Sequence, residues 1–248
     1  MARSTKKKTG DVPLTEFPVV FMSYDEPWAD EGWQSLLALR PDAKRVHGVK
    51  GLNACHVAAA EEAGSERFLT VDADTVLMDA ALNVSVPASL LQPDFRLDWQ
   101  SRNTVNGIVS GNGSLKLWSR ELAMAMRSHE AAPDDCVSLD ADIGSIKPGR
   151  SRLVLMPGCF SRSDPAGTPY HGFRAGFRET AFLSWLQRRS GSTSSGAAGL
   201  SQLLSIWCSL GRHARNGLWV LYGARMGLLA EHFWSGWDIR EIHDYGWF

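Results

Sequence analysis

The sequence predicts an α/β fold, with a mostly parallel sheet, helices on both faces and an appended antiparallel hairpin region. The first observation is a pair of short apolar runs, at residues 18–24 and 67–71, typical of strands buried on both faces. The second is that helical patterns separate the strand patterns of the first half. The third is the set of Asn-Gly and Gly-Asn-Gly turns after residue 100, which favour antiparallel hairpins.

The first half of the chain reads as two consecutive βαβ units. PVVFMSY (18–24) predicts a strand, and WADEGWQSLLALRP (28–41) a helix with acidic residues in its first turn and a proline as its stop. AKRVHG (43–48) predicts a short strand, LNACHVAAAEEAG (52–64) a helix that ends at its glycine, and RFLTVD (67–72) the next strand. Such alternation predicts a doubly wound sheet, whose ligands bind beyond the carboxyl ends of its strands.

The second half has weaker patterns. RLDWQSRNTVNGIVSGNGSLKLWSR (96–120) mixes strand-like pieces with turn residues, and ELAMAMRSH (121–129) predicts a helix. SGSTSSGAAG (190–199) has the composition of a flexible loop.

Composition and charge exclude several classes of protein. The 248 residues carry 26 basic and 27 acidic side chains, so the chain as a whole has no nucleic-acid signature. The four cysteines are widely spaced, which argues against a zinc knuckle or a disulfide framework and favours a reducing cytoplasm. Arginines interrupt the apolar stretch 203–229, so we expect no membrane insertion.

Two carboxylates follow the third predicted strand, in the segment FLTVDADTVL (68–77). Asp72 and Asp74 are two residues apart, so on an extended segment they point to the same side. Their mutual repulsion calls for a cation, and Mg²⁺ or Mn²⁺ is the usual partner, bridging to the phosphates of a nucleotide. A turn in which both side chains are solvated is the alternative interpretation.

Strand, helix, strand, helix, strand and then VDADT resembles the nucleotide-binding half of a GT-A glycosyltransferase, whose fold is Rossmann-like and whose DxD motif binds metal and nucleotide. RNTVNGIVSGNGSLKLW (102–118) and YHGFRAGFRETAFLSWL (170–186) resemble the central and acceptor-side segments of such enzymes. The segments WCSLGRHARNG, YGARMGLLAE and IHDYGWF resemble a group of tailed-phage glycosyltransferases. That resemblance implies a hydroxymethylated pyrimidine of phage DNA as one candidate acceptor; a protein, a glycan or a small molecule is the alternative.

The local cluster Arg3, Lys6, Lys7 and Lys8 predicts a solvated, disordered tail over residues 1–16, and a contact with phosphate is the alternative. The resemblance implies that residues 17–248 form a single domain. Within it we expect a nucleotide-binding half (17–86), an acceptor half (87–189) and a C-terminal helical region (200–248).

The same resemblance implies roles for particular residues. Asp74 would be the direct metal ligand, and Asp72 would contact the ribose or share the metal. A late histidine or aspartate often completes the metal shell in this family, and His243 and Asp244 have that place. Asp25, after the first strand, would lie near the base or ribose, unless it only forms the turn before Pro27.

Other donor-site candidates come from residue chemistry. His47, Lys50 and Gly51 follow the second strand at the same sheet edge, where a lysine can neutralise a diphosphate and a glycine allows close backbone approach. Arg102, Asn103 and Asn106 could hydrogen-bond sugar hydroxyls. An ordinary turn explains either group equally well.

Glu179 is the predicted catalytic base. In GFRETAFLSWL it stands where a turn is expected to become a helix, so that the helix dipole would favour its ionised form. It would then take the acceptor's proton in a single inverting displacement. His171, Arg174 and Arg178 surround it in sequence and could hold an acidic acceptor, and Asp140, in the second DxD segment SLDADIG, is the reserve base.

The expected protein is therefore a metal-dependent, inverting glycosyltransferase that uses a nucleotide-sugar, most often a UDP-sugar in this family. A phosphatase of the haloacid-dehalogenase type, with Asp72 as nucleophile, also matches DxDxT, but its motif usually lies on the first strand. A nucleotide- or carbohydrate-binding module without catalysis is the third interpretation.

Overall fold

The computed structural model describes residues 10–111, 115–128, 130, 152–190 and 195–243, which divide into two compact units. The sheet unit takes the described residues of 1–101, 110–130 and 140–162. The helical unit takes those of 102–109, 131–139 and 163–248. No helix within the described ranges has the length and apolar character needed to cross a bilayer.

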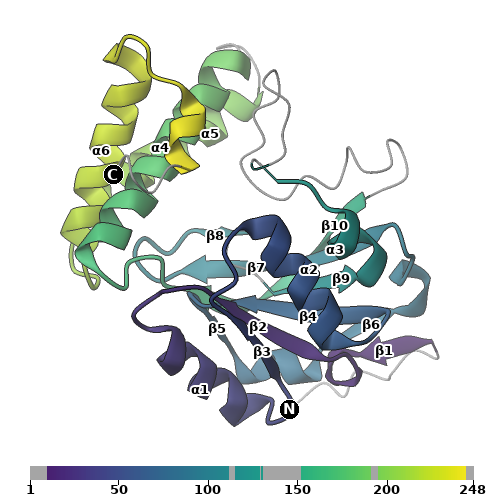
Figure 1. Ribbon diagram of the computed structural model, residues 1–248. Helices are drawn as coiled ribbons and strands as arrows, with labels where there is room; N and C mark the ends of the chain where they lie inside the picture. Colours follow the sequence, from purple (N-terminus) through teal and green to yellow (C-terminus); the bar gives the residue numbers. More distant parts are fainter. Residues whose placement is uncertain (1–9, 112–114, 129, 131–151, 191–194, 244–248) are drawn as a thin grey trace, which may run out of the picture. The chain divides into compact units, whose positions relative to one another are not determined.

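The sheet unit is built on an eight-stranded mixed sheet (Figure 1). Its strand order is β3-β2-β4-β9-β7-β10-β5, with β8 paired to β7. These strands are β2 (Val19–Ser23), β3 (Lys44–His47), β4 (Arg67–Asp72), β5 (Thr75–Leu77), β7 (Phe95–Asn103), β8 (Val109–Ser110), β9 (Lys116–Ser119) and β10 (Arg152–Ser163).

The two predicted βαβ units are present, and they determine the parallel part of the sheet. Strand β2 leads through α1 (Ala29–Leu39) to β3, and β3 leads through α2 (Leu52–Ala63) to β4. Strand β2 pairs in parallel with both β3 and β4. As expected, α2 ends at Gly64, which adopts the left-handed conformation that a glycine tolerates best (φ 63°).

The prediction of a mostly parallel sheet with appended hairpins is wrong. Strand β9 lies beside β4 and antiparallel to it, with Leu69 opposite Leu117, and β7 pairs antiparallel with β9. The turn-rich segment therefore continues the same sheet instead of forming a separate layer. Burial explains this arrangement, because Leu97, Leu117 and Trp118 are inaccessible to solvent and must be covered on both faces.

Helices cover both faces of the sheet, as predicted. Alternating residues of β2 point to opposite sides, so Val19 and Phe21 join the core under α1, while Val20 and Met22 join the core under α2. Helix α3 (Arg120–Ala125) packs on the α2 side and is capped by the Ser119 hydroxyl, which accepts from the Leu122 amide. Each face therefore has its own apolar core.

Part of the predicted N-terminal tail is structured. Residues 1–9, with the basic cluster, lie outside the described residues, whereas β1 (Asp11–Pro13) pairs with β6 (Ser85–Pro87) and runs into the short 3₁₀ helix η1 (Leu14–Glu16). Leu14 is 2% exposed. Burial of this side chain, and not local propensity, fixes the segment. Two further 3₁₀ turns, η2 (Asp79–Asn83) and η3 (Ala88–Leu90), flank β6.

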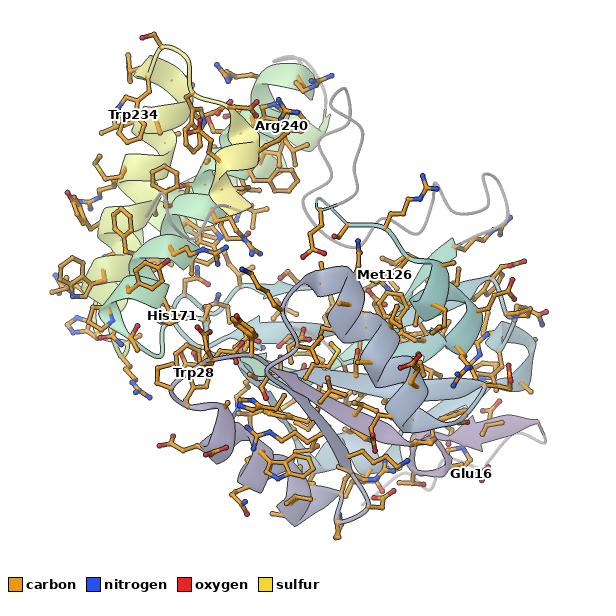
Figure 2. All side chains as sticks on the ribbon, viewed as in Figure 1. Glu16, Trp28, Met126, His171, Trp234 and Arg240 are labelled. Atoms are coloured by element: carbon orange, nitrogen blue, oxygen red, sulfur yellow. The ribbon has the colours of Figure 1, made fainter. Side chains whose placement is uncertain are left out.

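The helical unit consists of α4 (Pro169–Ser190), α5 (Ser195–Ser209), α6 (Gly217–Phe233) and the 3₁₀ turn η5 (Ile239–His243). Trp234 and Arg240 lie near its C-terminal end (Figure 2). The prediction of a flexible loop over 190–199 is wrong for residues 195–199, because α5 begins at Ser195. Apolar residues further along α5, such as Leu204 and Trp207, are buried and hold this helix.

Helices α4 and α6 approach each other through glycines. A Cβ atom at Gly176 of α4 would collide with the carbonyl oxygen of Val220, and one at Gly223 of α6 with that of Phe173. The Thr180 hydroxyl donates across the same contact to the carbonyl of Ala224 at 2.7 Å. The backbones of α4 and α6 are therefore in direct contact at these glycines, where larger side chains would keep the two helices apart.

A buried carboxylate is also used for structure in this unit. Glu231 of α6 is 4% exposed, pairs with Arg188 of α4 and accepts from the indole N–H of Trp237 at 2.8 Å. Because its charge is paired and hydrogen-bonded, its burial is tolerated.

Candidate functional site

The carboxyl ends of β2, β3 and β4 meet at one edge of the sheet. The strand register places Ser23 opposite His47 and Met22 opposite Asp72. The ends of these strands and the segments that follow them hold the donor-site candidates predicted for the first half of the chain: Asp25, His47, Lys50, Gly51, Asp72 and Asp74.

The order of these strands creates a topological switch point between β2 and β4. The chain passes from β2 to β3 on one side and returns through α2 to β4 on the other. The segments after β2 and β4 both continue on the α1 face, because Gly32 of α1 packs against Ala73 and because Leu77 of β5 shares a core with Ala29 and Leu36. Doubly wound sheets bind ligands beyond the carboxyl ends of their strands at such a switch point. Asp25 follows β2, Asp72 ends β4 and Asp74 lies in the turn after β4, so the three aspartates flank this point.

The two aspartates are positioned differently. Asp72 is the last residue of β4, whereas Asp74 lies in the tight turn to β5 and accepts from the hydroxyl of Thr75 at 3.2 Å. Helix α1 packs closely against this turn. A Cβ atom at Gly32 of α1 would lie only 3.0 Å from the carbonyl oxygen of Ala73. Both aspartates are half-buried.

Lys116 is a residue of this site that the sequence analysis missed. Its ammonium nitrogen donates to Asp72 Oδ2 at 3.2 Å, and its side chain is only 12% exposed. Lys116 reaches Asp72 because β9 is antiparallel to β4, and no local pattern in SLKLWS indicates that pairing. The repulsion between the two aspartates is thus partly offset by the chain's own cation.

A buried polar ladder continues from Lys116 across the sheet. Asp98 is opposite Lys116 in the register and forms a bidentate ion pair with Arg96, at 2.8 and 2.7 Å. Arg96 in turn lies over the ring of Trp118, whose indole N–H donates to Thr70. Each of these charges has a partner, as buried charges require.

His56 of α2 covers the same ladder. Its ring packs edge-on against Trp118, with centroids 5.0 Å apart, and its Nδ1 lies 2.9 Å from the Leu52 carbonyl. Burial lowers the pKa of His56, so the imidazole is neutral at physiological pH and adds no charge beside Lys116.

The N-terminus of α2, where Lys50 and Gly51 were predicted to contact a diphosphate, already carries an anion. The carboxylate of Glu130 accepts from the backbone amides of Leu52 and Asn53, at 2.6 and 3.1 Å. Gly51 has φ 99° and a Cβ there would meet this carboxylate at 3.2 Å. The contact satisfies two of the amides that a helix N-terminus leaves open. The Lys50 side chain is exposed.

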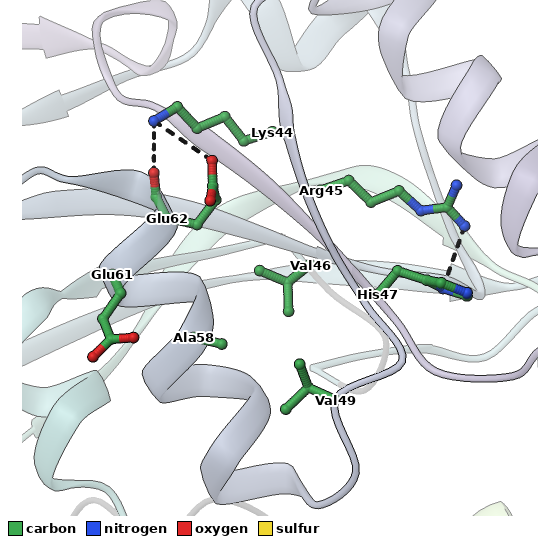
Figure 3. A pocket seen from close by; sticks show the side chains of 8 residues that line it. All are labelled: Lys44, Arg45, Val46, His47, Val49, Ala58, Glu61 and Glu62. Carbon is green, nitrogen blue, oxygen red and sulfur yellow. Dashed lines mark hydrogen bonds and ion pairs between the residues drawn. The ribbon is translucent and has the colours of Figure 1, made fainter.

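His47 is engaged within the sheet edge. Its Nδ1 lies 2.9 Å from the Ser23 hydroxyl, and Arg45, which pairs with Asp30 at 2.7 Å, lies 3.4 Å away. A shallow depression beside β3 and α2 includes His47, but neither Asp72 nor Asp74 (Figure 3). Lys44 and Glu62 pair across it, so it offers few unsatisfied charges.

Three donor-site candidates belong to the helical unit. Asn103 accepts from the amides of Val105 and Asn106, and Asn106 accepts from the amide of Ile108 at 3.1 Å. Arg102 donates to the carbonyl of Gly107 at 3.4 Å. These contacts are those of a turn, the alternative interpretation of this segment.

The prediction that Glu179 opens a helix is wrong. Helix α4 begins at Pro169, so Glu179 lies in its middle, where the helix dipole gives no support. The glycines of HGFRAGF suggested a turn, but Gly172 and Gly176 are buried against α6 and continue the helix. Glu179 lies 3.8 Å from Arg178, and its side chain is 18% exposed.

The acceptor-site candidates occupy one face of α4 at positions i, i+3 and i+7. His171 Nδ1 lies 2.7 Å from the Thr168 hydroxyl, and Arg174 donates to the Ile242 carbonyl at 3.4 Å. Asp140 and Asp244 lie outside the described residues, and for His243 only its place in η5 is described. Within the described ranges, no three His, Cys, Asp or Glu side chains gather as a ready metal site.

Comparison with known proteins gives little similarity. No protein-family model and no curated protein sequence matches this chain. Among solved structures, a glycosyltransferase involved in the glycosylation of the major capsid of PBCV-1 is 11% identical, with a TM-score of 0.37 over 61% of this chain and 94% of its own. HddC from Yersinia pseudotuberculosis is 14% identical, with a TM-score of 0.32 over 63% of this chain and 76% of its own.

One further expectation concerns Lys116. Lys116→Met should remove the cation beside Asp72 and, after allowance for solvent screening, cost about 1 kcal/mol of stability, or roughly 3 °C in Tm. Added Mn²⁺ should then raise the Tm of the variant more than that of the parent chain, because it replaces the lost charge. Differential scanning fluorimetry measures both effects.

Lys44→Met is the matched control, since Lys44 pairs with Glu62 at 3.8 Å and both side chains are nearly half exposed. It should change neither Tm nor the Mn²⁺ response appreciably. An equal Mn²⁺ response in all three proteins would show that the ion does not bind beside Asp72.

Proposed function

We propose that this protein is a metal-dependent glycosyltransferase that moves a sugar from a nucleotide-sugar, most simply a UDP-sugar, to a hydroxyl acceptor. One observation carries the proposal: Asp72 ends β4 and Asp74 lies in the turn after it, at the carboxyl edge of the parallel strands. An isolated DxD pattern is weak, but at this point its carboxylates adjoin the crevice in which doubly wound sheets bind nucleotides.

The residues at this edge suit a hard divalent ion carried in with the donor. Mg²⁺ is commonly held by one or two carboxylates and completes its shell with substrate phosphates and water, so Asp72 and Asp74 suffice as protein ligands. When bound, the ion would neutralise charge on the departing diphosphate. Lys116 supplies a second positive charge at this point, through its ion pair with Asp72 Oδ2.

The segment after β2 suits the nucleoside. Asp25 is exposed there and can accept from ribose hydroxyls, the role the sequence predicts for it. Tyr24, which the sequence analysis did not single out, is 42% exposed directly after β2 and offers an aromatic face for a base. A nucleoside at Tyr24 and Asp25 would direct its diphosphate toward Asp72 and Asp74.

The transfer itself is one displacement. The acceptor oxygen forms a bond to the anomeric carbon as the bond between that carbon and the diphosphate oxygen breaks. The acceptor proton passes to a base, for which Glu179 remains our prediction. The electron pair of the broken bond leaves with the nucleoside diphosphate.

The test is a donor panel. The full chain is incubated with Mn²⁺ or Mg²⁺ and with UDP-, GDP- and other nucleotide-sugars, and thermal stability and release of free nucleotide are followed. We expect one donor to stabilise the protein only when the metal is present. If no donor stabilised the protein and the protein cleaved a generic phosphate ester, the glycosyltransferase proposal would be rejected in favour of the phosphatase interpretation.

The donor found in this way then serves to test acceptors. Duplexes that carry hydroxymethylcytosine or hydroxymethyluracil, compared with unmodified duplexes, address the DNA acceptor that the phage resemblance implies. Incorporation of labelled sugar only into the modified duplexes is the expected result. Sugar transfer to a glycan or protein hydroxyl instead would keep the enzyme class and reject the DNA acceptor.

A further inference from the structure

Helix α6 has an outward face that is apolar and exposed within the helical unit. The aromatic face, as we call it, consists of Leu218, Trp219, Tyr222, Leu229 and Phe233, and the adjoining Trp234. Leu218 is 68% and Phe233 77% exposed. The residues within α6 fall in an arc of roughly 100° on an ideal helix.

The opposite side of α6 is fully used by packing. Val220, Ala224, Gly227 and Ala230 are buried, and Gly223 and Gly227 bring the backbone against α4. Apart from Arg225, Glu231 and His232, the helix is therefore apolar on both sides, although only one side is covered. Helices of that kind are normally buried in a protein core or in lipid. An exposed apolar patch of this kind marks a contact surface.

The charges beside the aromatic face have one sign. Arg212 and Arg215 are exposed just before α6, and Arg225 is exposed on the helix between the apolar residues. The one acidic residue in 210–235 is Glu231, which is buried and paired with Arg188. Over residues 210–235 the surface is thus apolar and basic without an exposed carboxylate, and the next acidic side chain, Asp238, is paired with Arg240.

We propose that the aromatic face of α6 binds the surface of an anionic lipid bilayer, with the helix lying in the plane of the interface. Tryptophan and tyrosine favour the boundary between headgroups and acyl chains, while leucine and phenylalanine enter the apolar layer. The arginines match the anionic headgroups. This binding needs no spanning helix, and it is independent of the donor site on the sheet unit.

Other occupants fit these residues less well. A second copy whose α6 crossed this helix at its middle would bring Arg225 near its own counterpart, and like charges oppose such pairing. Nucleic acid would attract the arginines but would leave Leu218 and Phe233 without an apolar partner. An acidic protein remains as an outcome of the experiment.

The test is flotation of the full chain with vesicles of neutral phosphatidylcholine and with vesicles that contain 30% phosphatidylglycerol. We expect flotation with the anionic vesicles, a blue shift of tryptophan emission, and loss of binding as salt rises. The double variant Leu218→Ser/Phe233→Ser should weaken binding at least about tenfold, because both side chains lose apolar area buried in lipid. Arg225→Glu should reduce the preference for anionic vesicles.

The matched control is Leu153→Ser/Leu155→Ser on β10, two leucines that are also exposed, 50% and 56%, but lie in the sheet unit. It should float like the parent chain. Circular dichroism confirms that each variant is folded, as expected for exposed positions. Absence of flotation, equal loss in both double variants, or a dimer or protein complex that depends on Leu218 and Phe233 without vesicle binding would overturn the proposal.

Discussion

Replacing Asp74 by alanine is expected to abolish the stabilisation that donor and Mn²⁺ together give, and to lower sugar transfer by about 100-fold or more, equivalent to about 2.7 kcal/mol in the barrier. The physical reason is that Asp74, in the turn after β4, supplies a carboxylate oxygen that the ion cannot obtain from alanine. Donor-dependent thermal shift and nucleotide release measure the two effects. Without donor, the variant should unfold near the temperature of the parent chain, because Asp74 is only half-buried.

Asp79→Ala is the control for this experiment, because Asp79 is an exposed carboxylate of η2 in the same unit. It should bind and turn over donor like the parent chain. Equal losses in Asp74→Ala and Asp79→Ala would indicate a general charge effect. Full activity in Asp74→Ala would reject the metal site and with it the proposed mechanism.

A second large effect is expected from Gly176→Ala. The new methyl group would collide with the carbonyl oxygen of Val220 and lie 2.8 Å from the amide nitrogen of Ala224, so α4 and α6 would have to separate. Because both neighbours are backbone, no side chain can move aside, and we expect a loss of about 3 kcal/mol or more. Urea unfolding followed by far-ultraviolet circular dichroism measures it.

The same substitution at Gly199 of α5 provides the control. Nothing lies within 4 Å of a Cβ at that position, so Gly199→Ala should leave stability unchanged or raise it by up to about 1 kcal/mol through helix propensity. If Gly176→Ala unfolded at the same urea concentration as the parent chain, the close approach of α4 and α6 would be refuted.

The parts of the fold that depend on local patterns could be predicted from the sequence. The strands β2 and β4 are short apolar runs, and α1 and α2 have acidic or glycine signals at their ends. The edge that gathers Asp25, His47 and Asp72 follows from the alternation of strands and helices. The roles of these residues stay predictions until the donor is known.

What could not be predicted depends on contacts far apart in sequence. The place of β9 beside β4 brings Lys116 to Asp72, 44 residues away, and nothing near Lys116 indicates its partner. The two glycines before Glu179 signalled a turn locally, yet their burial against α6 makes them part of a helix. Leu14 is a similar case. The predicted tail that contains it is polar in composition, but its last residues are ordered because the Leu14 side chain occupies a core position.

The division of the chain into two units also limits how the protein can be dissected. The chain leaves the sheet unit after Ser101 and returns to it at Ser110, and the excursion places Val105 in the core that contains Leu204 and Trp207. A shortened chain that ends before α4 would keep this excursion without the apolar partners it was built to meet. A stop codon before α4 is therefore not enough to isolate the sheet unit for crystallisation or isotope labelling. Residues 102–109 must also be replaced with a short polar turn.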